Sequence, residues 1–474
     1  MTQTTSATAV PVQREAPALD RRLVALGSVV VLGAIMSILD ATIVNVAMRT
    51  IGRDLHASIA TIQWVITGYL LGFATVIPAI GWAAQRFGAK RVFIGAVVLF
   101  AVSSALAGSA VSVGELIAFR VLQGVGGGMI LPVGQLIVAQ AAGPKRMGRV
   151  MSVLGVPMLL GSMTGPVIGG LIVSGTSWRW IFFINPPVAL VAVVLAVRLL
   201  PSGRGGADGA AGGRLDLLGL VLLCGGIGSI TYGMSQASTR GFGASPPLTL
   251  IGAGAALVAG YALHALRLKE RALIDVTLFR HRGFAVSMAA NLMVGIALFG
   301  ALVLLPLYWQ IVRGASPLAT GLLLTPQALG AAAALPLAGK VTDRAGPAFV
   351  VPAGIALGLG GLAAYTQTGT GTPYAVLAAA LFVLGLGLGA TFVPLMAAAY
   401  RDLPRAAIPS VTSAFNTVQR IGGSIGTALL AVTLQEAMTR HAPSHAFDSA
   451  FWVACALTAA ALIPALLLPK GTQS

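Results

Sequence analysis

Long apolar runs repeat along almost the whole chain and limit what it can fold into. Hydrophobic residues make up 57% of the sequence and charged residues only 9%, whereas soluble domains carry roughly 25% charged residues. Each run has the ~20 residues that a helix needs to cross the ~30 Å hydrocarbon core of a bilayer. Because a backbone in lipid must satisfy its own hydrogen bonds, these runs predict helices. We therefore expect an all-α polytopic membrane protein.

Charged and turn residues divide the chain into fourteen such segments, arranged as six, two and six. The predicted spans are 23–46, 60–80, 92–110, 115–138, 150–172, 180–199, 215–236, 247–266, 284–308, 318–338, 347–366, 373–397, 409–433 and 449–469. The domains expected from them are a disordered cytoplasmic N-terminus (1–22), an N-terminal six-helix bundle (23–200), a Gly-rich cytoplasmic linker (201–214), two additional transmembrane helices (215–267), a basic cytoplasmic loop (268–283) and a C-terminal six-helix bundle (284–470).

The basic residues predict the orientation. With the N-terminus in the cytoplasm, 22 of the 30 lysines and arginines fall in loops on that side and six on the other. This asymmetry follows the positive-inside rule, and it predicts a multi-pass protein of the cell inner (plasma) membrane with both termini cytoplasmic. The net charge of +17 then reflects topology and contact with anionic membrane lipids. Because the charges are scattered over many short loops, we expect no nucleic-acid partner.

One acidic residue, Asp40, lies inside the first predicted span. An ionised carboxylate there costs about 2.5–3.5 kcal/mol, and such residues usually mark ion or proton pathways. At 1.5 Å per residue, Asp40 lies about 26 Å from the inner start of its span, and Arg120 lies about 8 Å from the outer start of the fourth. Both are therefore expected in the outer part of the membrane. Burial favours protonated Asp40, whereas a neighbouring arginine favours the carboxylate. The two could carry a proton, or form a static ion pair that fixes helix packing.

The two six-span units share a loop sequence. Gly81-Trp-Ala-Ala-Gln85-Arg86-Phe-Gly88 follows the second span of the first unit, and Gly339-Lys-Val-Thr-Asp343-Arg344-Ala-Gly346 follows the second span of the last unit. Matching loops at matching positions indicate a duplicated unit, as in many secondary transporters.

Several motifs together resemble those of one known family. They are Leu39-Asp40-Ala-Thr42-Ile-Val44-Asn45-Val46-Ala47, Arg120-Val-Leu-Gln123-Gly124, Gly161-Ser-Met-Thr-Gly165-Pro166-Val-Ile-Gly169-Gly170, the loop from Gly81, Trp178-Arg179-Trp180-Ile-Phe-Phe-Ile-Asn185-Pro186 and Asn416-Thr-Val-Gln419-Arg420-Ile-Gly422-Gly423. The chain resembles the fourteen-spanner drug/proton antiporter family of the major facilitator superfamily, which is of the multidrug efflux type. This resemblance implies the major facilitator fold, with two six-helix bundles and two extra transmembrane helices.

The resemblance also implies roles for individual residues. Asp40 and Arg120 would couple transport to protons. The residues expected to act in gating or conformational change are Gly81, Gln85, Arg86, Gly88, Gly161, Gly165, Pro166, Gly169, Gly170, Asp343, Arg344 and Arg420. Gln85 stands where the family's loop motif has an acid, so we expect a weaker latch in the N-terminal half than in the C-terminal half.

Methionine, aromatic and amide side chains within the spans are candidates for the substrate cavity, because they make adaptable contacts. They are Met36, Asn45, Gln123, Met129, Met158, Asn291, Met293, Phe299, Tyr308, Gln310, Gln327, Phe415 and Asn416. Each of them could instead be ordinary helix packing.

The sequence contains no Walker loop, no H-E-x-x-H and no C-x-x-C. We therefore expect no enzyme, no cofactor and no metal, and we expect the proton gradient as the source of energy. The function implied by the resemblance is export of amphipathic organic compounds (drugs and toxic compounds) in exchange for protons, by a monomer using alternating access. Two alternatives stay open. One is a dedicated exporter of one endogenous metabolite or self-made antibiotic, and the other is a membrane receptor or scaffold that transports nothing.

Overall fold

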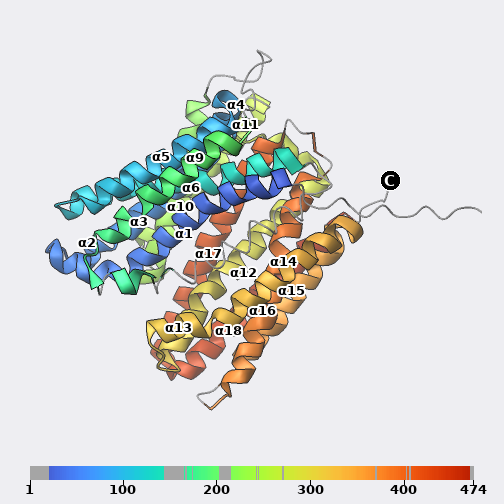
Figure 1. Cartoon of the computed structure of the whole chain (residues 1–474). Coiled ribbons are helices and arrows are strands. Elements are labelled where there is room, and N and C mark those ends of the chain that lie inside the picture. Colours follow the sequence, from blue (N-terminus) through green and yellow to red (C-terminus); the bar gives the residue numbers. More distant parts are fainter. Residues whose placement is uncertain are drawn as a thin grey trace, which may run out of the picture.

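The computed structural model describes residues 21–142, 165, 168–172, 175–201, 215–241, 243, 245–269, 272–368, 371–401, 403–404 and 407–469. Within these residues every regular element is a helix, and twelve helical stretches are long and apolar enough to cross a membrane. Figure 1 shows them in two groups, blue to green for the N-terminal half and yellow to red for the C-terminal half. The prediction of an all-α membrane protein is confirmed for this part of the chain.

The N-terminal half begins with α1, the long helix that carries Asp40. Its described elements are α1 (Arg21–Asp54), α2 (Ile59–Ile62), α3 (Trp64–Val76), the 3₁₀ turn η1 (Ile77–Ala79), α4 (Ile80–Phe87), α5 (Ala89–Gly108), α6 (Val113–Ala142), α8 (Trp180–Phe183) and α9 (Asn185–Leu199). Most of the predicted fifth span, 150–172, lies outside the described residues, as do residues 1–20 and 202–214.

The C-terminal half contains helices of similar length. They are the 3₁₀ turn η4 (Val276–Arg280), α12 (Arg282–Ile311), α13 (Pro317–Leu323), α14 (Thr325–Ala345), α15 (Pro347–Ala363), the 3₁₀ turn η5 (Ala364–Gln367), α16 (Tyr374–Tyr400), α17 (Ile408–Arg440) and α18 (Pro443–Leu466). Helix α17 has 33 residues but does not count among the twelve apolar stretches, because polar residues run along it. The total of fourteen spans therefore stays a prediction.

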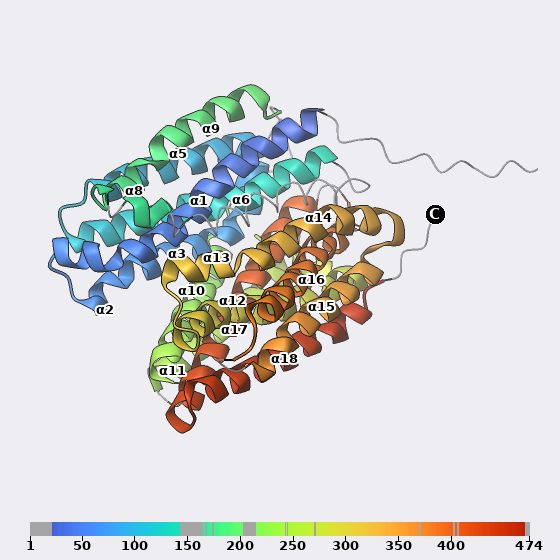
Figure 2. The ribbon, with the colours of Figure 1, turned by 60° about the horizontal axis from the view of Figure 1, so that its bottom comes forward.

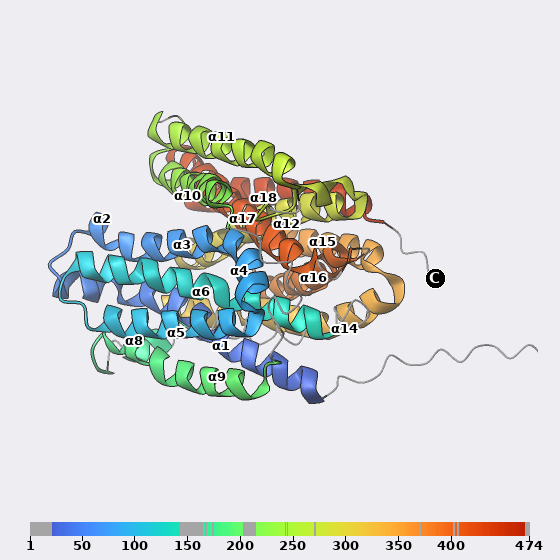
Figure 3. The ribbon, with the colours of Figure 1, turned by 90° about the horizontal axis from the view of Figure 1, so that it is seen from above.

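Two further helices, α10 (Leu217–Arg240) and α11 (Ser245–Leu268), form a hairpin between the halves. A Cβ added to Gly226 would lie 3.0 Å from the carbonyl oxygen of Gly254, so the two helices touch through glycine. Helix α10 contacts both α3 and α17. Figure 3 shows α10 beside these helices and α11 at the outer edge of the molecule. The hairpin therefore packs against both halves along one side.

The two halves meet near the start of α17. The Ser413 hydroxyl donates to the carbonyl oxygens of Ile77 at 2.9 Å and Pro78 at 3.1 Å, and Asn416 Nδ2 donates to Gln135 Oε1 at 3.2 Å. These are the hydrogen bonds that join the two six-helix units within the described residues. They lie on the side that the basic loops predict to be cytoplasmic. At the other side, the ends that carry α2 and α13 diverge in Figures 1 and 2.

Candidate functional site

A buried ion pair lies in the N-terminal half. Arg120 Nη1 donates to Asp40 Oδ2 at 2.5 Å, and the two side chains are 1% and 0% exposed. Both residues are expected from the sequence in the outer part of the membrane, and the structure brings them into contact. Their role in proton coupling stays a prediction. A charge pair in such a place is tolerated only when further hydrogen bonds satisfy its remaining atoms.

Two amides complete the shell around Asp40. Gln123 Nε2 donates to Asp40 Oδ1 at 2.9 Å, and Asn185 Nδ2 approaches the same oxygen at 3.3 Å. Gln123 Oε1 accepts from Arg120 Nη1 at 2.7 Å, while Arg120 Nε donates to the carbonyl oxygen of Val65 at 3.2 Å. Arg120 and Gln123 lie three residues apart on α6, so they project from the same face. The network therefore joins α1, α3, α6 and α9.

Aromatic rings shield the guanidinium. The Cζ atom of Arg120 lies 4.3 Å from the ring centroid of Tyr69 and 5.7 Å from that of Phe182. The Tyr69 hydroxyl is 3.0 Å from the hydroxyl of Ser37, one turn before Asp40 on α1. The charges are thus enclosed by protein.

Asn185 was not among the predicted site residues. It opens α9, and its Nδ2 also donates to Ser104 Oγ on α5 at 3.0 Å. The only signal in the sequence is the segment that ends in Asn185-Pro186, which resembles a family segment. Two contacts hold the same region against the end of α1: Trp178 Nε1 donates to Asp54 Oδ2 at 2.8 Å, and Arg179 pairs with Asp54 at 3.8 Å.

The glycine motif of the predicted fifth span lies against α1. A Cβ at Gly165 would overlap the Thr42 hydroxyl, and a Cβ at Gly169 would lie 3.3 Å from the Ile43 backbone. Gly170 faces open space. Gly165 and Gly169 therefore let the two segments approach closely, within a turn of Asp40. Their role in conformational change stays a prediction. Gly161 and Pro166 lie outside the described residues.

The paired loops have similar backbones in the two halves. Gly88, between α4 and α5, has φ of 85°, and Gly346, between α14 and α15, has φ of 84°. Side chains other than glycine rarely adopt such angles. Gln85 is partly buried, whereas Arg86 and Arg344 are exposed. The side chain of Asp343 lies outside the described residues.

Two residues next to these loops make defined contacts. A Cβ at Gly81 would lie 3.2 Å from the carbonyl oxygen of Pro409, so α4 touches the start of α17 there. Lys90 Nζ donates to the carbonyl oxygens of Val197 at 2.7 Å and Leu200 at 2.8 Å. Lys90 therefore caps the end of α9, whose last carbonyls lack partners within the helix.

Arg420 lies on α17 and is partly buried. Its Cζ atom is 4.1 Å from the ring centroid of Phe73 on α3. This contact joins the two halves. Two residues after Arg420 begins a G-x-S-x-G pattern, from Gly422 to Gly426. Its central residue, Ser424, donates to the Arg420 carbonyl at 3.1 Å inside α17. The pattern therefore sits in a continuous helix and not at the strand-to-helix turn of a hydrolase.

The predicted cavity residues are dispersed. Met36, Asn291, Tyr308, Gln327, Phe415 and Asn416 are buried, Met129, Met293 and Phe299 are partly buried, and Gln310 is exposed. Met158 and the side chain of Asn45 lie outside the described residues. Gln123 belongs to the Asp40 network, and Asn291 Nδ2 donates to the Phe415 carbonyl at 2.7 Å. Tyr308 packs edge-on against Tyr365, with centroids 5.5 Å apart. A role in substrate binding stays a prediction for each.

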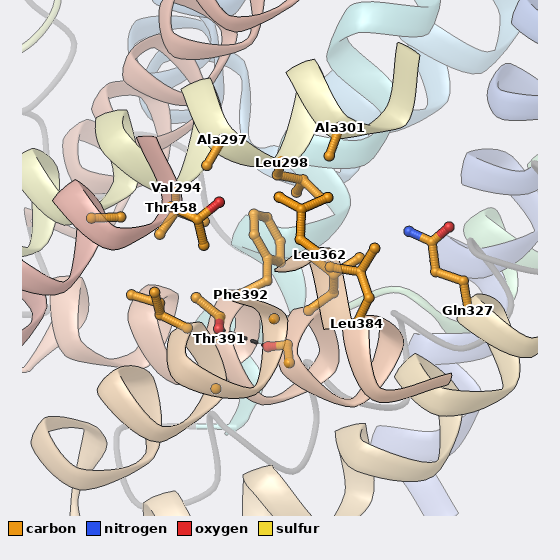
Figure 4. A pocket seen from close by; sticks show the side chains of 16 residues that line it. Val294, Ala297, Leu298, Ala301, Gln327, Leu362, Leu384, Thr391, Phe392 and Thr458 are labelled. Atoms are coloured by element: carbon orange, nitrogen blue, oxygen red, sulfur yellow. Dashed lines mark hydrogen bonds between the residues drawn. The ribbon is translucent and has the colours of Figure 1, made fainter. Parts of the chain in front are cut away.

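An apolar pocket lies inside the C-terminal half, between α12, α15, α16 and α18 (Figure 4). Gln327 of α14 contributes an amide at one end of it, and Phe392 lines its wall. The Phe392 ring meets Phe415 edge-on at 5.9 Å between centroids. Two of the predicted cavity residues are therefore on or next to this pocket.

The helical fold and the buried charge network define a polytopic membrane transporter. The chain matches the Major Facilitator Superfamily model over residues 30–427, and it belongs to that superfamily. It is 38% identical to the multidrug resistance protein B homolog of Mycobacterium tuberculosis, with 96% of this chain and 92% of the relative covered. It is 32% identical to the putative multidrug resistance protein MdtD of Serratia proteamaculans, with 93% and 92% covered.

Solved structures show the same fold at low sequence identity. The human organic anion transporter MFSD10 superposes with a TM-score of 0.64 at 16% identity, covering 96% of this chain and 100% of that chain. The proton:xylose symporter XylE superposes with a TM-score of 0.63 at 15% identity, covering 93% and 94%. The expected major facilitator fold is thereby confirmed.

Proposed function

We propose that the protein exports amphipathic organic compounds in exchange for protons by alternating access. The observation that carries this proposal is the carboxylate of Asp40, buried within α1 and held by Arg120, Gln123 and Asn185. A buried ionisable residue in a membrane helix is a functional-site hypothesis by default. The multidrug-resistance names of the relatives support the substrate class.

The geometry suggests how a proton would act. When Asp40 is ionised, its charge balances that of Arg120. When Asp40 is protonated, Arg120 keeps Gln123 Oε1 and the Val65 carbonyl as acceptors, but the ion pair is lost and the site gains one positive charge. Such a change in a buried site can bias a two-state element. Thr42 stands two residues after Asp40 on α1, and it touches Gly165. This contact would transmit the change in charge at Asp40 to the segment that carries Gly165.

Several further expectations belong to the same proposal. The protein would act as a monomer in the inner (plasma) membrane with both termini cytoplasmic, in contact with lipid but not with nucleic acid. The proton gradient would supply the energy, with no cofactor and no catalytic step. In one state of the transport cycle, the contacts between α4 and α17 would close the side that is predicted to be cytoplasmic.

Proton movement in inverted vesicles tests the proposal. A panel of lipophilic cations, neutral drugs and organic anions is added to energised vesicles that contain wild type or Asp40→Asn. We expect compound-triggered proton release from wild type and none from Asp40→Asn. Asp54→Asn is the matched control, because Asp54 ends the same helix with a side chain that is 53% exposed. Compound transport by wild type without any proton dependence would contradict the proposal, and full compound-triggered proton release by Asp40→Asn would contradict the coupling role of Asp40. A wild type that moves neither protons nor compounds would favour a protein that transports nothing.

A further inference from the structure

Arg420 places a positive charge near the middle of the membrane. It stands twelve residues after Ile408, where α17 begins, which corresponds to about 18 Å along the helix. The hydrocarbon core is ~30 Å thick. Charged residues at this depth are rare and usually pair with an acid or line a pathway.

Within the described residues Arg420 has no acidic partner. The ion pairs found there are Asp40 with Arg120, Asp54 with Arg179, Asp216 with His264 and Asp448 with His445. No described side chain or carbonyl accepts a hydrogen bond from the Arg420 guanidinium. In this part of the chain the guanidinium lies over the face of Phe73, in a cation–π arrangement.

The full sequence offers no other acid at that depth. It has 13 acidic residues. Asp40 is the only one in the interior of a predicted span, and Arg120 and two amides already hold it. The others stand in predicted loops or within about two turns of a helix end. Among the residues that the structure describes, no acid therefore balances the charge of Arg420.

The surroundings of Arg420 combine aromatic and hydroxyl groups. On α17, one turn further, the Ser424 hydroxyl donates to Thr231 Oγ1 of α10 at 3.4 Å. Next to Thr231, the ring of Tyr232 lies 5.3 Å from that of Trp64 on α3. The guanidinium thus lies against α3 of the N-terminal half, and α10 of the extra hairpin touches α17 one turn further on.

We propose that Arg420 binds the anionic group of the substrate, so that the transported compounds are amphipathic organic anions. A guanidinium binds a carboxylate or sulfonate through two parallel hydrogen bonds, and the aromatic rings would contact the apolar body. The inference rests on the proposed export function. It adds a consequence for energetics: one anion moving out against one proton moving in carries two charges, so the inside-negative membrane potential drives both movements. A monovalent cation exchanged for one proton would be electroneutral.

Three dansyl compounds that share one alkyl chain and end in a carboxylate, a carboxamide or a trimethylammonium group test the inference. Binding to purified protein and uptake into inverted vesicles are measured for wild type, Arg420→Gln, Arg420→Lys and Arg440→Gln. Arg440 is the control, because it is exposed at the end of the same helix.

We expect wild type to bind the carboxylate about tenfold more tightly than the ammonium compound. Arg420→Gln should weaken carboxylate binding about tenfold and leave carboxamide binding within about twofold, while Arg420→Lys falls between. Arg440→Gln should resemble wild type. If Arg420→Gln does not fold, two measurements still test the anion site. They are the preference of wild type for the carboxylate over the ammonium compound, and the carboxylate binding of Arg420→Lys.

Two results separate the inference from the function on which it rests. Equal binding of the three compounds by wild type, or an equal loss of all three in Arg420→Gln, overturns the anion site and leaves proton antiport standing. Selective carboxylate binding that depends on Arg420, together with transport that no proton gradient affects, overturns antiport and leaves the anion site standing. A membrane potential imposed with valinomycin should accelerate carboxylate export. No acceleration would contradict export of an anion against a proton.

Discussion

Asp40 on α1 and Arg120 on α6 form an ion pair at 2.5 Å, although they are 80 residues apart in the sequence. Both side chains are buried, and the rings of Tyr69 and Phe182 cover the guanidinium of Arg120. The pair makes the N-terminal half electrically neutral at its centre. Arg420 in the C-terminal half has no such partner in the described residues. The N-terminal half thus holds a pair of opposite charges, whereas the C-terminal half holds the single positive charge of Arg420.

Removing one member of the buried pair should be more harmful than removing both. Arg120→Gln leaves the Asp40 carboxylate without its cation, and breaking a buried pair this way costs about 3–5 kcal/mol. In the double variant Asp40→Asn, Arg120→Gln no charge is left, so we expect most of that stability to return. Thermal unfolding of purified protein in detergent measures both effects.

The control for this experiment is Arg179→Gln. Arg179 pairs with Asp54 at 3.8 Å, with side chains 32% and 53% exposed, and such surface pairs contribute about 0–1 kcal/mol. If the double variant were as unstable as the sum of its single variants, Asp40 and Arg120 would not be coupled.

Asn185 should support transport through its contact with Asp40. Asn185→Leu removes the amide donor 3.3 Å from Asp40 Oδ1 and leaves an apolar side chain beside the carboxylate. A hydrogen bond to a charged group contributes about 1.5–3 kcal/mol, so we expect transport to fall about tenfold or more. Compound uptake into inverted vesicles measures the loss.

Ser104→Ala is the comparison for Asn185→Leu. It removes only the second acceptor of the Asn185 amide, 3.0 Å away, and should reduce transport less. Unchanged transport by Asn185→Leu with normal protein abundance would show that the contact at 3.3 Å is not needed for transport.

The similar depth of Asp40 and Arg120 in the membrane could be predicted from the sequence, because the rise of a helix fixes the depth of each residue. Their depth does not say which helices are neighbours. Asn185 shows this limit: it reaches Asp40 only because the start of α9 packs beside α1. The missing partner of Arg420 could also be predicted from the sequence, whereas its position on Phe73 could not.

The place of the extra hairpin could not be predicted, because lipid and protein interiors are similarly apolar and hydropathy does not distinguish the faces of a buried helix. The position of α10 between α3 and α17 depends on contacts such as that of Cys224, whose thiol donates to the Thr75 carbonyl at 2.7 Å. Tyr308 shows the same limit for single residues. It was predicted as a cavity residue, and it lies in a buried aromatic cluster with Tyr365 and Phe451.

The glycines next to Asp40 should differ sharply in their tolerance of a methyl group. Gly165→Ala would force its Cβ into the Thr42 hydroxyl, whereas Gly170→Ala, in the same motif, meets open space. We expect Gly165→Ala to lose most transport activity while Gly170→Ala keeps it, as measured by vesicle uptake. Thr42→Gly in the Gly165→Ala background removes the obstructing side chain and should restore part of the activity. Equal activity of Gly165→Ala and Gly170→Ala would exclude a role for close approach here.

The contact between α4 and α17 should control access from the predicted cytoplasmic side. Gly81→Leu pushes a side chain against Pro409, whose carbonyl oxygen would lie 3.2 Å from the new Cβ. A single cysteine at Ser413, which is fully buried, should then react several-fold faster with a maleimide in a cysteine-free background. Gly95→Leu is the control, because Gly95 faces open space on α5.

Gln85→Asp should have the opposite effect on the same cysteine. Gln85 lies one turn beyond Gly81 on α4, near the start of α17, where the helix dipole favours a negative charge by about 0.3–1 kcal/mol. An aspartate there should hold the two helices together and slow labelling about twofold to fivefold, because a difference of 1.4 kcal/mol corresponds to a factor of ten. Raising the ionic strength should reverse the slowing, since salt screens exposed charges. If Gly81→Leu and Gln85→Asp both raised, or both lowered, the labelling rate of this cysteine, the contact between α4 and α17 would not be the gate.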